Sequence, residues 1–71
     1  MADRKVYQVV PAKNIGWDIK SSRRVVGHAE TREEAVDAAI RAAKQHPLAR
    51  VKAYLRDGTL EEDRLFGEEP Q

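Results

Sequence analysis

The fold of this chain is decided by the stretch Thr31–Lys44, TREEAVDAAIRAAK. Thr31 stands where an N-cap is expected, and Glu34 follows three residues later, which is the spacing of a capping box. Acidic residues begin the stretch and the cations Arg41 and Lys44 end it, as the helix dipole favours. Apolar side chains recur between them at the spacing of one buried helical face. The stretch therefore predicts an amphipathic helix.

Alanines make up most of the apolar face of this helix. A face of small side chains has to approach its sheet closely, so the sheet must supply the bulky groups of the core. We expect these to be Trp17, Ile19, Val51 and Leu55. Pro47 should end the helix, because the residue before a proline avoids helical angles. The predicted inward residues are Ala35, Val36, Ala39, Ile40, Ala42 and Ala43.

Strand-like segments lie on both sides of the helix. Connections between them are short, so consecutive strands should pair antiparallel. The last segment is rich in charge, which is typical of a protected edge strand. The chain thus predicts an α+β fold: a small antiparallel sheet in the order β-β-β-α-β-β, with one amphipathic helix packed on one face. The expected strands are 5–11, 17–20, 24–28, 50–55 and 59–66, the last two joined by Asp57-Gly58.

The size of the chain bounds what it can do. Its 71 residues predict a single domain, with an ordered core over about 5–67 and a flexible tail over 68–71. There is no cysteine, which excludes disulfides and thiolate metal sites and suits a reducing cytoplasm. We expect neither a signal peptide nor a membrane span, and therefore a cytoplasmic protein.

Candidate catalytic groups are few. His28 and His46 are the only histidines, and their spacing is a poor metal-ligand pattern. Ser21 and Ser22 lie in a predicted turn, where His28 would have to reach back across a strand to act as a base. The scattered glycines match no phosphate-binding loop. We expect no enzyme, no metal, no cofactor and no evident small-molecule ligand.

The first strand is apolar on both of its faces. Tyr7 and Val9 share one face, and Val6 and Val10 share the other. One helix can cover only one face of a sheet, and exposed apolar surface commonly marks an interface. The leading hypothesis is therefore that the chain is a non-catalytic interaction module. It would form a homodimer through Val6 and Val10, with Tyr54 as a further candidate contact.

Nucleic-acid binding is the alternative hypothesis. The basic residues Lys13, Lys20, Arg23 and Arg24 gather around the second and third predicted strands and could contact phosphates. Against this, the net charge is only +1 and the pI about 8.1, below what nucleic-acid domains usually show. Outward aromatic side chains that could stack on bases are also sparse.

The order of several short motifs resembles a known family. The chain is similar, over about Tyr7–Pro70, to the bacterial domain-of-unknown-function family numbered 2188, although Phe66 stands where that family usually has tyrosine. The resemblance implies the fold and a bacterial cytoplasmic setting, and it implies no activity. The motifs are Val9-Val10-Pro11, Gly16-Trp17, Ile19-Lys20, Thr31-x-x-Glu34-Ala35, Asp57-Gly58 and Phe66-Gly67.

Overall fold

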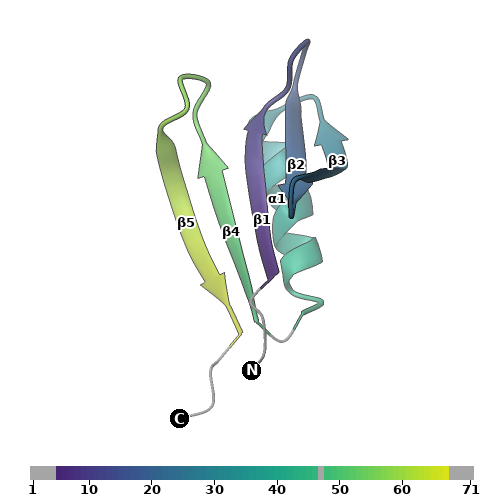
Figure 1. Ribbon diagram of the computed structural model, residues 1–71, viewed down its shortest axis with the longest axis vertical. Helices are drawn as coiled ribbons and strands as arrows, with labels where there is room; N and C mark the ends of the chain where they lie inside the picture. Colours follow the sequence, from purple (N-terminus) through teal and green to yellow (C-terminus); the bar gives the residue numbers. More distant parts are fainter. Residues whose placement is uncertain (1–4, 47, 68–71) are drawn as a thin grey trace.

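The computed structural model describes residues 5–46 and 48–67 of the chain (Figure 1). Its elements follow the order β-β-β-α-β-β, so the predicted α+β class and element order are confirmed. The helix end expected at Pro47 and the tail expected over 68–71 lie outside the described residues. The elements are β1 Lys5–Pro11, β2 Trp17–Ser21, β3 Arg24–Ala29, α1 Arg32–Ala43, β4 Ala49–Tyr54 and β5 Leu60–Phe66.

The five strands form one sheet in the order β3-β2-β1-β4-β5. β1 and β4 pair parallel, with Tyr7 opposite Val51, so the expectation of a wholly antiparallel sheet is wrong at this one junction. The reason is that the chain returns along the sheet through α1 after β3, so that β4 runs in the same direction as β1 (Figure 1). A parallel neighbour needs such a crossover. The doubly apolar β1 thereby becomes the central strand.

The core lies between α1 and one face of the sheet. The helix contributes Ala35, Ala39 and Ala43, which are all fully buried. The predicted bulky residues Trp17, Ile19 and Val51 are buried against them, together with Tyr7 and Val9 of the central strand. The expectation for Leu55 is wrong: it follows the end of β4 and is only half-buried, because its backbone closes the β4–β5 turn with Thr59 and Gly58.

The helix begins as predicted. The Thr31 side chain accepts a hydrogen bond from the Glu34 N–H at 3.1 Å, which satisfies one free backbone donor of the first turn. The Thr31 hydroxyl also lies 3.2 Å from Glu34 Oε1, to which it donates. With 12 residues α1 is too short to cross a membrane, and the described part of the chain has no other helix.

Three side-chain contacts join parts of the fold that are distant in the sequence. Arg32 of α1 lies 3.2 Å from Glu61 of β5, an ion pair that reaches the strand outside the area the helix covers (Figure 1). Arg56 lies over the Trp17 ring, 5.1 Å from its centroid. His46, just after the helix, is hydrogen-bonded through Nε2 to the Tyr7 hydroxyl at 3.0 Å. The sequence did not predict these three contacts.

Candidate functional site

No other described element packs on the sheet face opposite α1, and we call this face the open face. Its members follow from strand alternation and register: where one residue of a strand packs on α1, the next points away. The open face consists of Val6, Gln8, Val10, Asp18, Lys20, Val25, His28, Arg50, Lys52, Tyr54, Leu60, Asp63 and Leu65.

Apolar side chains gather on the β1, β4 and β5 part of the open face. Tyr54 pairs with Leu60, and Val10 comes one residue after the Val9–Ala53 pair, which brings it beside Tyr54. The next open-face row along the strands is polar and joins Gln8 to Lys52 and Lys52 to Asp63, and the row beyond it joins Val6 to Arg50 and Arg50 to Leu65. The structure therefore brings Val10 and Tyr54 together and places Val6 on the same face, two rows away. We call Val6, Val10, Tyr54, Leu60 and Leu65 the apolar half of the open face.

An ion pair lies within the apolar half. Arg50 Nε donates to Asp63 Oδ1 at 2.7 Å, and Arg50 Nη2 donates to Oδ2 at 2.5 Å. The hydrogen bond from Arg50 lowers the pKa of Asp63, and the same bond raises the pKa of Arg50. Both groups are therefore charged across the physiological range, and each neutralises the other.

The acidic run of β5 is divided among three partners. Asp63 pairs with Arg50, Glu61 lies near Arg32, and Glu62 lies 3.3 Å from Arg64. These carboxylates bind cations of different elements and do not face one another as an acid–base pair.

The four basic residues predicted for nucleic-acid contact do not form one continuous surface. Lys13 and Lys20 line a single pocket at the β2 side of the open face. Arg24 is opposite Ser21 in the register, which directs it to the other side of the sheet, and Arg23 lies in the β2–β3 turn. The structure thus brings Lys13 and Lys20 together and separates them from the two arginines.

The β2–β3 turn is locally strained. Ser22 and Arg23 have φ angles of 53° and 70°, the left-handed region that glycine and asparagine adopt more readily. Two consecutive left-handed residues fit the twist of a two-residue hairpin. No glycine or asparagine marks this turn type in the sequence, because a serine and an arginine occupy its two central positions.

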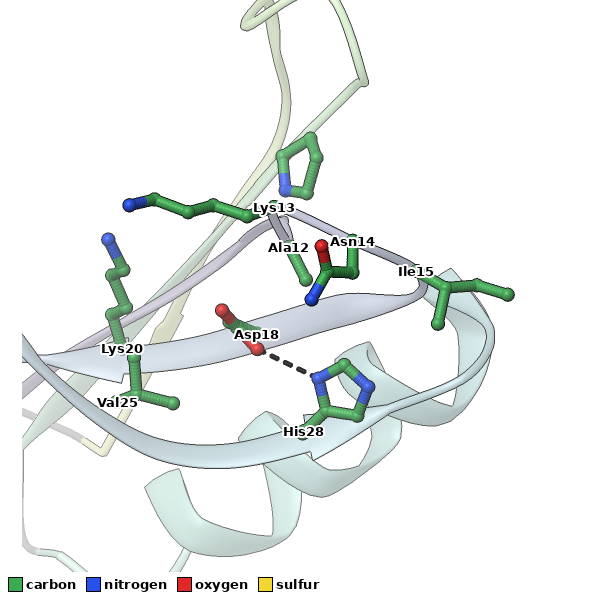
Figure 2. Close-up of a pocket in the computed structure, with 9 residues that line it drawn as sticks. Ala12, Lys13, Asn14, Ile15, Asp18, Lys20, Val25 and His28 are labelled. Carbon is green, nitrogen blue, oxygen red and sulfur yellow. Dashed lines mark hydrogen bonds and ion pairs between the residues drawn. The ribbon is translucent and has the colours of Figure 1, made fainter.

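The pocket lies between the β1–β2 loop and the open-face side chains of β2 and β3 (Figure 2). Its volume is about 440 Å³. His28 Nδ1 donates to Asp18 Oδ1 at 2.8 Å at its floor, which fixes the imidazole. The sequence did not predict this pair, because the contact depends on the register that places the two residues opposite each other across β2 and β3. The pocket is lined by Pro11, Ala12, Lys13, Asn14, Ile15, Asp18, Lys20, Val25 and His28.

The structure also separates the residues considered for nucleophilic chemistry. Ser21 is buried on the helix side of β2, whereas His28 lies on the open face. The two therefore do not form a nucleophile–base pair. Among residues 5–46 and 48–67, no group of three or more potential metal-ligating side chains comes together.

Comparison with known proteins identifies a family. A family model described as an uncharacterized protein conserved in bacteria, DUF2188, matches residues 7–66. This confirms the family suggested by the sequence motifs and covers most of the 71 residues. No curated protein and no solved structure matches the chain.

Proposed function

The chain belongs to the bacterial DUF2188 family, and on that premise we propose that it is a non-catalytic interaction domain. It self-associates through the apolar half of its open face. We place it in the cytoplasm, which its cysteine-free sequence suits. The observation that carries the proposal is a set of five apolar side chains on one uncovered sheet face, arranged on both sides of the row formed by Gln8, Lys52 and Asp63.

The exposure of the apolar half supports an interface. Leu65 and Leu60 are 62% and 45% exposed, although they stand on the same face as the half-buried Val6, Val10 and Tyr54. Apolar side chains exposed in this way gain free energy when they are removed from water. Interfaces of this type combine apolar residues and a tyrosine with a polar component.

The ion pair is compatible with burial in an interface. Arg50 and Asp63 already satisfy each other through two hydrogen bonds, so a partner that covers them leaves neither charge unpaired. Nothing in the pair requires a charged partner. A second copy of the chain supplies the same apolar side chains and the same internally neutralised ion pair, so we take it as the occupant. Each copy also brings Lys52 to this face, and its long side chain can keep the ammonium group in water.

The size of the surface sets the expected strength. Three strands about 4.8 Å apart and about 20 Å long present roughly 300 Å² in projection. This is well below the roughly 800 Å² per partner of a standard stable interface. We therefore expect a weak dimer whose population depends strongly on protein concentration.

Sedimentation equilibrium over a range of concentrations tests this proposal. The wild type should show reversible self-association. Val10→Asp should remain a folded monomer, because a dimer of this variant would bury an unpaired carboxylate. Val25→Asp is the matched control: Val25 is also on the open face and 56% exposed, but it lies on β3, outside the apolar half. Equal association of the wild type and Val10→Asp, or a wild type that stays monomeric at every concentration, would refute the proposal.

The nucleic-acid alternative has weaker support. It needs Lys13, Lys20, Arg23 and Arg24 to contact one phosphate backbone. The two lysines line the pocket on the open face, whereas Arg23 lies in the β2–β3 turn and Arg24 is directed to the opposite face of the sheet. The support that remains is the pair of lysines at the pocket.

A further inference from the structure

We infer that the pocket beneath the β1–β2 loop binds a phosphate group, with Lys13 and Lys20 as its cationic contacts. None of the residues that line this site belongs to the apolar half, although Asp18 of the lining is paired with Val10 across β1 and β2. It therefore does not depend on the proposed self-association.

The charges of the lining favour an anion. Both lysines stand at the same side of the pocket, where Lys13 runs to the left from the loop and Lys20 runs upward from β2 (Figure 2). Neither lysine takes part in the ion pairs found among the described residues. Asp18 is the only carboxylate of the lining, and its Oδ1 accepts the hydrogen bond from His28. Two lysine charges therefore stand at the pocket, and neither forms an ion pair with a carboxylate of the described residues.

The floor of the pocket is held in place before any ligand arrives. His28 is fixed on one side by Asp18 and on the other by Gly16, where an added Cβ would lie 2.9 Å from His28 Nε2. The loop itself is closed by the hydrogen bond from the Ala12 N–H to the Gly16 carbonyl at 3.1 Å. A site that is ordered in advance loses less conformational entropy when it binds a ligand.

The polar groups suit phosphate more than other ligands. Lysine ammonium groups bind phosphate oxygens as point charges, and the Asn14 carboxamide, which points into the pocket in Figure 2, can donate further hydrogen bonds. The volume of about 440 Å³ leaves room for more than the phosphate alone. The lining contains no Phe, Tyr or Trp on which a base could stack. The phosphate could belong to a small phosphorylated molecule or to a polynucleotide backbone.

Amide NMR titrations with inorganic phosphate and then pyrophosphate, replacing chloride at constant ionic strength, test the site. We expect saturable shifts confined to residues 12–16 and to the amides of Asp18, Lys20 and His28. Lys13→Ala and Lys20→Ala should each weaken binding about tenfold, as expected for the loss of one charge-assisted contact. Lys52→Ala is the matched control, because Lys52 lies on the same row of the open face beyond Gln8 and outside the pocket.

Equal weakening by Lys20→Ala and Lys52→Ala would overturn the inference, because it would mean general attraction to a positive surface. Shifts that chloride reproduces would overturn it as well. A short oligonucleotide then distinguishes the two sources of phosphate. Binding through the same amides that is tighter than pyrophosphate and falls steeply with salt supports a polynucleotide. Saturation by pyrophosphate with no gain from the oligonucleotide supports a small phosphorylated ligand.

Discussion

Arg50 of β4 and Asp63 of β5 form a two-point ion pair on the open face, with hydrogen bonds of 2.7 and 2.5 Å. The pair joins the edge strand to the rest of the sheet at the centre of the proposed interface. It also explains why a strand as acidic as β5 can flank an apolar surface, since the carboxylate that shares this face is neutralised by a cation of the neighbouring strand.

The pair predicts a specific dependence of stability on pH. The hydrogen bond from Arg50 holds the pKa of Asp63 below its ordinary value of 3.8. The ion pair therefore stabilises the folded state fully above pH 3.8, and this stabilisation is lost as the pH falls through the lowered pKa. Urea unfolding of the wild type and Asp63→Asn should therefore differ most near neutral pH and converge in acid. The difference should be small because both side chains are partly exposed to water, which screens their interaction. A difference that is constant with pH would contradict this role.

Gly16 should tolerate no side chain. Its φ is +85°, and an added Cβ would lie 2.4 Å from the Ala29 carbonyl oxygen. We expect Gly16→Ala to lower the free energy of unfolding by about 2–4 kcal/mol, from backbone strain together with steric overlap. Gly58 is the matched control: its φ is +91° but nothing lies within 4 Å of its Cβ position, so Gly58→Ala should cost about 1 kcal/mol. Equal losses in urea unfolding would show that the loop does not approach β3 closely.

The alanine face of α1 should resist enlargement. Ala39 is fully buried against the sheet, so Ala39→Leu should destabilise the domain by about 1–3 kcal/mol through overpacking. Ala38 is exposed on the same helix, and Ala38→Leu should change stability by less than about 0.5 kcal/mol. Thermal or urea unfolding measures both variants. If the two substitutions had the same effect, the helix would not pack on the sheet through its alanines.

The sequence predicted the elements of the fold better than their arrangement. Helix capping by Thr31 and strand alternation are local signals, so element order and the inward faces could be predicted and, apart from Leu55, are confirmed. The pairing of β1 with β4 joins residues more than 40 positions apart, such as Tyr7 and Val51, and no local pattern encodes which strand becomes central. The apolar second face of β1 was the one hint of a central strand.

The candidate site was predictable only in part. Alternation placed Val6, Val10 and Tyr54 on outward faces, but Leu60 and Leu65 were not recognised as their neighbours because that required the β4–β5 register. Lys13 and Lys20 were identified by charge alone. The Asp18–His28 pair and the pocket above it arise from the pairing of β2 with β3 and from the fold of the β1–β2 loop, which composition and spacing do not specify.

The most direct test of self-association is an isotope-filtered NOESY experiment on an equal mixture of labelled and unlabelled protein at high concentration. The account predicts intermolecular contacts between the methyl groups of Val6, Val10 and Leu65 of one copy and the Tyr54 ring or the same methyl groups of the other. It predicts none from the exposed side of α1. Intermolecular contacts confined to other surfaces, or their absence at the highest concentration, would contradict a dimer formed through the open face.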